Sequence, residues 1–137
     1  MRYLGIDIGA RRTGFAVGET ELGMVQPLRV VEHPHEDAML EGVDELVSEH
    51  APDALVIGLP LNMDDTEGPA AKNARRLAGV LEERTGLPVH LQDERLTSFE
   101  ADARMARSGR THAEKKRVRD AIAAAALLED YLASCEG

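Results

Sequence analysis

The stretch Leu4-Gly5-Ile6-Asp7-Ile8-Gly9-Ala10-Arg11-Arg12-Thr13-Gly14-Phe15-Ala16-Val17-Gly18 predicts two β-strands joined by a short turn. Side chains alternate between the two faces of a strand, so Asp7 lies between glycines on one face, opposite leucine and isoleucine. The second strand repeats this pattern, with Phe15 and Val17 opposite glycine and alanine. We interpret the small-residue face as a place where something large approaches the backbone. The alternative is an edge-strand aspartate that discourages aggregation.

The length of 137 residues predicts one domain, spanning residues 1–137. The longest apolar run, Ala121 to Leu128, is far shorter than the ~20 residues of a membrane span. The amino terminus becomes polar and charged almost at once, which is not typical of a signal peptide. We therefore expect a cytoplasmic protein. Cys135 is the single cysteine, so it cannot pair within the chain or complete a cysteine metal site.

The net charge of -9 is unevenly distributed along the chain. Between Val30 and Ala71 there are 11 acidic residues and no Lys or Arg, which leaves 14 acids and 16 bases elsewhere. Seven bases and one acid lie between Arg104 and Arg119. This basic strip is compatible with a polyanion bound on one side of the protein, or with a solvated basic loop.

Hydrophobic periodicity predicts an α/β chain in which an antiparallel meander precedes parallel strands. The loop from Pro60 to Pro69 is long and polar for a compact domain, which favours a functional loop, and a mobile surface loop fits equally well. The expected strands are Arg2 to Gly9, Thr13 to Glu19, Met24 to Glu32, Ala54 to Leu59 and Pro88 to Leu91. The expected helices are Glu36 to His50, Pro69 to about Thr85, Thr97 to Met105 and about Val118 to Leu132.

Acidic residues from distant parts of the chain occupy positions that could meet: Asp7 in the first strand, Asp93 and Glu94 after the last strand, and Asp120 at the expected start of the last helix. Carboxylates brought together repel unless protons or cations intervene, and Mg²⁺ takes oxygen ligands of this kind. One or two such ions could support hydrolysis of a phosphodiester, with Arg11, Arg12 and the basic strip holding the backbone. Asp120 could instead be a helix cap. The five histidines show no zinc spacing.

The motifs Gly5-Ile6-Asp7-Ile8-Gly9, Val56-Ile57-Gly58-Leu59-Pro60-Leu61-Asn62-Met63-Asp64, Asp93-Glu94-Arg95-Leu96-Thr97 and Asp120-Ala121-Ile122-Ala123-Ala124 resemble, in order, those of the YqgF (RuvX) family. The resemblance implies a ribonuclease H-like fold: a five-stranded mixed sheet with helices on both faces. It also implies a Mg²⁺- or Mn²⁺-dependent nuclease, acting in Holliday-junction resolution or in maturation of the 16S rRNA precursor.

Carried over by position, the catalytic and metal-binding acids implied are Asp7, Glu94 and Asp120, with Asp93 as an alternative ligand. A Glu at the end of the fourth strand serves the related RuvC resolvases, but that position here is near Gly58. The partner implied is precursor rRNA or branched DNA, bound by a monomer or homodimer on the small-residue face around Asp7. The expected nucleic-acid-binding residues are Arg11, Arg12, Asn62, Arg95, Arg107, Arg110, Lys115, Lys116 and Arg117.

Two departures from the family pattern bear on these expectations. Asp65 stands where glycine is usual and could change the loop's turn, and Arg119 stands where an apolar residue is usual and could shift the helix start. Two other functions fit the residues. One is a non-catalytic nucleic-acid-binding module of the same fold, and the other is a fragment like the actin and sugar-kinase ATPases, whose phosphate loop also has a glycine-flanked aspartate.

Overall fold

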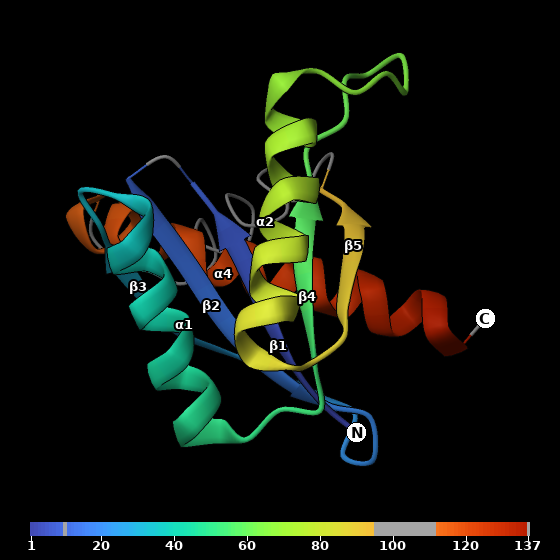
Figure 1. Ribbon diagram of the computed structural model, residues 1–137. Helices are drawn as coiled ribbons and strands as arrows, with labels where there is room; N and C mark the ends of the chain where they lie inside the picture. The colour runs from blue at the N-terminus through green and yellow to red at the C-terminus, as the bar shows by residue number, and fades with distance from the viewer. Residues whose placement is uncertain (10, 95–111, 137) are drawn as a thin grey trace.

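The computed structural model describes residues 1–9, 11–94 and 112–136, with side chains in the last of these ranges described from 119 to 134 (Figure 1). Its strands are β1 (Arg2–Ile8), β2 (Arg12–Glu19), β3 (Met24–Glu32), β4 (Ala54–Leu59) and β5 (Val89–Asp93). Its helices are α1 (Glu36–His50), α2 (Pro69–Thr85) and α4 (His112–Glu136). The expected helix from Thr97 to Met105 lies outside the described residues.

The strands form one mixed sheet in the order β3-β2-β1-β4-β5. β1 pairs antiparallel with β2 and parallel with β4, and β4 pairs parallel with β5. The carboxyl ends of β1, β4 and β5 therefore meet at one edge of the sheet, which is the upper edge in Figure 1. Because β1 is the middle strand, the interpretation of Asp7 as an edge-protecting residue is wrong.

Two hydrophobic cores cover the two faces of the sheet. Leu4, Ile6 and Phe15 pack with the apolar stripes of α1 and α2 on one face. On the other face Ala16 and Val56 pack with Ala124 and Leu128 of α4 and their neighbours. Figure 1 shows α1 and α2 in front of the sheet and α4 behind it. Every residue of β4 is buried, as expected for a strand covered on both faces.

Helix α4 covers the small-residue face of β1 and β2. It leaves no room for a ligand at Gly5 and Gly14. A Cβ at Gly5 would lie 3.1 Å from both the Ala124 carbonyl oxygen and the Leu128 Cβ. A Cβ at Gly14 would overlap the Asp120 carbonyl group. The expectation that a large group approaches this face is confirmed, but the expectation that the group is a phosphodiester is wrong at these two glycines. A helix fills that space.

The last helix begins earlier than its apolar pattern predicts. α4 starts at His112, so Asp120 is the ninth residue of the helix and not part of its first turn. The interpretation of Asp120 as an N-terminal cap is therefore wrong, and residues 112 to 119 of the basic strip are helical, not a loop. None of the described helices combines the length and the hydrophobicity that a membrane span requires.

Candidate active site

Asp7 and Glu94 meet at the carboxyl edge of the sheet and share a side-chain hydrogen bond. Burial raises the pKa of Glu94 to about 7, and the charge of Asp7 adds to this effect. Burial also raises the pKa of Asp7 to about 6, with a further contribution from the charge of Asp120. The hydrogen bond lowers the pKa of Asp7 and raises that of Glu94, so the Glu94 carboxyl donates and the Asp7 carboxylate accepts.

The absence of a side chain at Gly58 lets Glu94 reach Asp7. A Cβ at position 58 would collide with Glu94 Oε2 and would lie 3.3 Å from Glu94 Cβ. The backbone N–H of Glu94 donates to the Leu59 carbonyl at 3.3 Å, which continues the β4–β5 pairing by one residue. The Glu94 side chain therefore occupies the space that Gly58 leaves open at the carboxyl ends of β4 and β5.

The alternation of β5 separates the two adjacent acids. Leu91 packs against the core beneath α2, and Asp93, two residues further on, shares that face of the strand. Glu94 follows on the opposite face, with Asp7. Asp93 still acts on the site at a distance, because its charge contributes to the raised pKa of Glu94.

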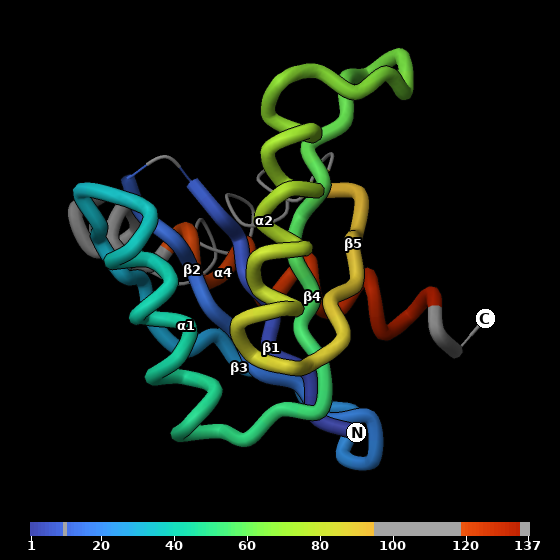
Figure 2. The backbone as a smooth tube through the Cα atoms, in the orientation of Figure 1, coloured from blue at the N-terminus to red at the C-terminus, as the bar shows by residue number. Residues whose placement is uncertain are grey.

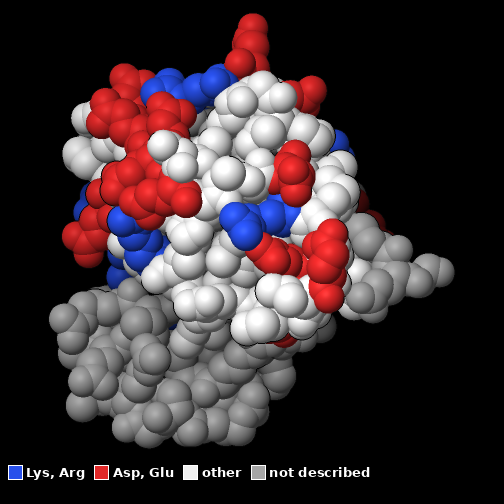
Figure 3. Space-filling view, turned by 90° about the horizontal axis from the view of Figure 1, so that it is seen from below, with Lys and Arg blue, Asp and Glu red and all other residues white. Residues whose placement is uncertain are grey.

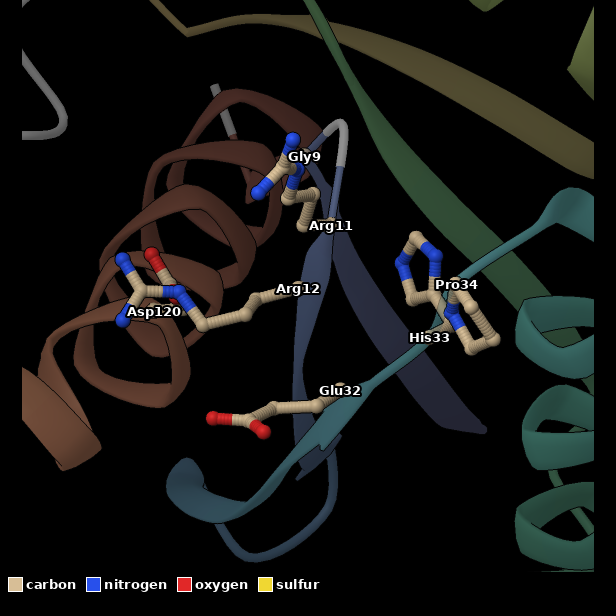
Figure 4. Close-up of a pocket in the computed structure, with 7 residues that line it drawn as sticks. All are labelled: Gly9, Arg11, Arg12, Glu32, His33, Pro34 and Asp120. Atoms are coloured by element: carbon tan, nitrogen blue, oxygen red, sulfur yellow. The ribbon is translucent and has the colours of Figure 1, made fainter.

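Asp120 comes from α4 and lies on the other side of Asp7. Its Oδ2 is buried, accepts no hydrogen bond from the described residues, and is 3.3 Å from Arg12 Nε. Figure 4 shows the Arg12 guanidinium beside the Asp120 carboxylate. The close approach of α4 to Gly14 places the Asp120 backbone against β2. Asp120 is thus held near Asp7 but is paired with a guanidinium.

The donor chemistry of these acids fits a divalent cation. Two hydrogen-bonded carboxyls with raised pKa values and a buried, unsatisfied carboxylate oxygen are hard oxygen ligands. Within residues 1–9, 11–94 and 112–136, however, no three His, Cys, Asp or Glu side chains form a metal-binding group. Asp120 faces Arg12 in this arrangement, so it would have to turn from Arg12 to join the other two acids.

A pocket of about 860 Å³ extends from Asp120 across the start of β2 (Figure 4). Arg12 lies on the α4 side of β2, and His33 lies on the other side. Arg11 forms no ion pair or side-chain hydrogen bond with a described residue, so its guanidinium remains available to a ligand. The pocket is lined by Gly9, Arg11, Arg12, Glu32, His33, Pro34 and Asp120.

His33 has a structural role that its sequence position did not reveal. Its Nε2 lies 2.8 Å from the hydroxyl of Thr13, which is fully buried. Its backbone N–H donates to the Arg11 carbonyl at 2.8 Å. Burial lowers the pKa of His33, which favours the neutral ring. Through these two hydrogen bonds His33 links the end of β3 to the start of β2, where Arg11 and Arg12 lie.

The loop between β4 and α2 carries Asn62 and leaves the sheet at the same edge as the acids, as Figure 2 shows. The Asn62 side-chain amide donates to the Thr66 hydroxyl at 2.9 Å, and that hydroxyl donates to Asp64 Oδ1 at 2.6 Å. Asp65 has a φ of 70°, a conformation that favours glycine. Aspartate at position 65 therefore adopts a backbone conformation that glycine adopts more readily.

The opposite end of the molecule is unsuited to a polyanion. Figure 3, which views the structure from below, shows acidic side chains gathered on that face with fewer basic ones among them. Met1, Arg2 and Arg29 at or near this end are paired with acidic side chains. The other expected nucleic-acid contacts lie beyond the described residues (Arg95, Arg107 and Arg110) or in the part of α4 described by its backbone alone (Lys115, Lys116 and Arg117).

Comparisons with known proteins identify the relatives of this chain. The model of the RuvX family, described as Holliday junction resolvase, matches residues 1–134. A protein of Azotobacter vinelandii named "Putative pre-16S rRNA nuclease" is 45% identical over 130 residues, covering 95% of this chain and 92% of its own length. A protein of the same name from Anaeromyxobacter sp. (strain Fw109-5) is 42% identical over 132 residues, covering 96% of each chain.

Solved structures support the fold. RuvC of T. thermophilus in complex with Holliday junction substrate has a TM-score of 0.62 at 19% identity, over 100% of this chain and 97% of that chain. The Fowlpox virus resolvase in complex with substrate Holliday junction DNA has a TM-score of 0.63 at 12% identity, over all of both chains. These likenesses confirm the ribonuclease H-like fold, and the family match together with the curated relatives shows that the chain belongs to the RuvX (YqgF) family.

Proposed function

We propose that this chain is a metal-dependent nuclease that hydrolyses phosphodiester bonds in structured nucleic acid. The observation that carries the proposal is the hydrogen-bonded pair of Asp7 and Glu94 at the strand ends, with pKa values raised to about 6 and about 7. Strongly raised pKa values in acids that converge from separate elements are typical of catalytic or metal-binding sites. The names of the family and of the curated relatives agree with a nuclease.

The ion in this proposal is Mg²⁺ or Mn²⁺, one or two per site, held by Asp7, Glu94 and Asp120. Asp93 remains the alternative ligand, although it lies on the other face of β5. When bound, such an ion supplies positive charge to the phosphate and lowers the pKa of a water molecule. The ion also has to displace the Glu94 proton and compete with Arg12 for Asp120, because the proton and the Arg12 guanidinium, together with the charge of Arg119 near Asp7, balance the carboxylates in the structure described here.

The protein's own groups position the substrate and control protons. Because burial raises the pKa of Glu94 to about 7, this carboxyl can hold or release a proton near neutral pH in the metal-free protein. Arg11 and Arg12 contribute guanidinium donors to the pocket beside Asp120, where a phosphate on the neighbouring nucleotide could be bound. We extend this surface to Asn62, Arg95, Arg107, Arg110, Lys115, Lys116 and Arg117.

The names of relatives point to two substrates. Curated relatives are named for pre-16S rRNA, and the family model is described by Holliday junctions. We propose maturation of the 16S rRNA precursor or resolution of Holliday junctions as the reaction. Resolution needs two cuts, so a homodimer would favour the junction and a monomer the RNA.

The test is cleavage by the full chain of a precursor 16S rRNA fragment and of a synthetic four-way DNA junction, with Mg²⁺, with Mn²⁺ and with EDTA. We expect metal-dependent cleavage of at least one substrate, and its loss in Asp7→Asn. Asp44→Asn is the matched control, because Asp44 is an exposed partner of Arg84 far from the site. Undiminished cleavage by Asp7→Asn would rule out the mechanism.

The alternative function, a non-catalytic nucleic-acid-binding module, predicts a different outcome of the same experiment. Binding that weakens steeply with salt, without cleavage under any metal condition, would support the module and contradict the nuclease. Cleavage that Asp7→Asn abolishes, with its binding retained, would contradict the module.

A further inference from the structure

A second, smaller pocket lies between the first turns of α2 and the carboxyl ends of β1 and β4. Its volume is about 240 Å³, roughly the space of eight water molecules at ~30 Å³ each. Among its described lining residues, Glu94 and Asn73 alone carry polar side chains. The others are Ile8, Gly9, Gly58, Pro60, Ala70, Ala74 and Leu77. A group that enters this pocket can therefore contact two polar side chains, those of Glu94 and Asn73.

The orientation of the Asn73 amide is fixed by a partner that can only donate. Arg76 lies one turn further along α2 and contacts the Asn73 side chain through Nε at 3.1 Å and Nη2 at 2.9 Å. A guanidinium has no acceptor, so the Asn73 atom that faces it is the oxygen. The amide nitrogen and its two N–H groups therefore face away from the guanidinium, and no described residue accepts a hydrogen bond from them.

Arg76 is itself held from a different element. Its guanidinium pairs with the carboxylate of Glu36, the first residue of α1, and Nη1 lies 3.3 Å from Glu36 Oε2. The network Glu36–Arg76–Asn73 therefore runs from α1 across α2 to the edge of the pocket. An exposed asparagine alone would rotate freely, whereas this one has its oxygen engaged twice.

We propose that Asn73 is a substrate-contacting residue, whose amide N–H donates to a backbone phosphate oxygen of the nucleotide on the Glu94 side of the scissile bond. Arg76 and Glu36 are its positioning residues. The inference rests on the proposed nuclease function and deepens it by assigning a second phosphate contact, on the opposite side of the acids from Arg11 and Arg12. The free N–H groups of the Asn73 amide donate hydrogen bonds, so they suit an anionic or hydroxyl oxygen. They cannot coordinate a further cation.

The test combines protein and substrate changes. Binding of the cleavable substrate to the full chain is measured in EDTA, with single neutral methylphosphonate linkages moved along the backbone around the cut. Asn73→Ala should weaken binding of the unmodified substrate about tenfold. Asn73→Asp should weaken it more, since it removes the donor and adds a negative charge. At one linkage the losses from Asn73→Ala and from the methylphosphonate should not multiply, because both remove the same contact.

Other variants separate contact from structure. Arg76→Gln should give a smaller loss at the same linkage, and Glu83→Gln, exposed near the other end of α2, should give none. The proposal is overturned if the losses multiply at every linkage. It is also overturned if Asn73→Ala changes only the pH dependence of cleavage, which would show that the amide positions Glu94. A wild-type chain that neither binds nor cuts would instead contradict the proposed function.

Discussion

Glu94 reaches Asp7 because position 58 carries no side chain. Gly58→Ala should push the Glu94 carboxyl away from Asp7, since the new Cβ would occupy the place of Oε2. With one of its ligands displaced, the site should bind Mn²⁺ at least about tenfold more weakly. The measurement is the rise in melting temperature on adding Mn²⁺, which follows the affinity of the folded state. An undiminished rise in Gly58→Ala would contradict the role given to Glu94.

Gly79 provides the matched control for that substitution. It lies in α2 with open space around its Cβ position. Alanine is favoured over glycine in a helix interior by about 0.5–1 kcal/mol. Gly79→Ala should therefore raise the melting temperature slightly and leave the Mn²⁺-induced rise unchanged. Comparing Gly58→Ala with Gly79→Ala distinguishes a general effect of an added methyl group from a specific loss of Mn²⁺ binding.

The raised pKa values of Asp7 and Glu94 predict how stability changes with pH. An acid whose pKa is higher in the folded state binds more protons when folded than when unfolded. Its contribution to stability is therefore greatest at low pH and is lost as the pH rises from about 4 to about 7. For the metal-free protein, we expect Asp7→Asn to be more stable than the wild type at pH 8, by an amount on the order of 2 kcal/mol.

Urea unfolding in EDTA at pH 5 and pH 8 measures this effect, as the difference between the variant and the wild type. The comparison is needed because the lowered pKa of His33 acts in the opposite direction near pH 6 in both proteins. If the difference between Asp7→Asn and the wild type is the same at both pH values, the burial of a charged Asp7 costs nothing. That result would contradict the raised pKa of Asp7 in the metal-free site.

At the scale of elements, the packing of α4 on β2 positions Asp120. Gly14→Ala would place a methyl group where the Asp120 carbonyl lies, so α4 has to move away from the sheet. Such overpacking typically costs 1–3 kcal/mol. At Gly5 the nearest α4 atoms are 3.1 Å from the Cβ position, so Gly5→Ala should cost less. Urea unfolding at pH 6 tests this order, and an equal or reversed order would contradict it.

The elements were predictable from the sequence where hydrophobic periodicity was unbroken. The expected bounds of β3, α1 and β4 match the structure, and those of β1 and β2 differ by one residue. The expected end of the last strand at Leu91 is wrong, because β5 continues to Asp93 in its pairing with β4. The start of α4 was not predictable, because the run Lys115-Lys116-Arg117 interrupts the apolar pattern that marks a buried helix face. The sequence also identified a cleared face on β1 and β2 without identifying its occupant, because an approaching helix and an approaching substrate both require glycine there.

The candidate site depends on contacts between residues far apart in the chain. Asp7, Glu94 and Asp120 were identified by their positions at strand ends and on a helix face, with the resemblance to a family as support. The pairing of Arg12 with Asp120, the space above Gly58 and the orientation of Asn73 could not be predicted, since each depends on side-chain packing between separate elements. Sequence patterns indicate which face of a strand is buried and where a helix or strand ends. Contacts between side chains of separate elements depend on how the folded molecule packs.

The whole molecule has a net charge of -9, yet its proposed ligand is a polyanion. The bases near the site and most of the acidic surface lie at different ends of the molecule. Arg11 and Arg12 lie close to Asp120 at one end of the sheet, and acidic side chains gather at the opposite end (Figure 3). Binding should therefore depend on a few bases near the site and not on net charge. Long-range repulsion from the acidic end is screened over about 8 Å at physiological salt.

Replacing both Arg11 and Arg12 by Gln should weaken binding to all nucleic-acid sequences alike. Each lost phosphate contact lowers the slope of log affinity against log salt by about one, so the double variant should lose up to about two. Arg84→Gln is the control, because Arg84 lies at the other end of α2 and pairs with Asp44. Its slope should equal that of the wild type. An equal loss per removed charge in the two variants would mean that binding follows total charge, and the assignment of the Arg11–Arg12 edge as the substrate surface would then be wrong.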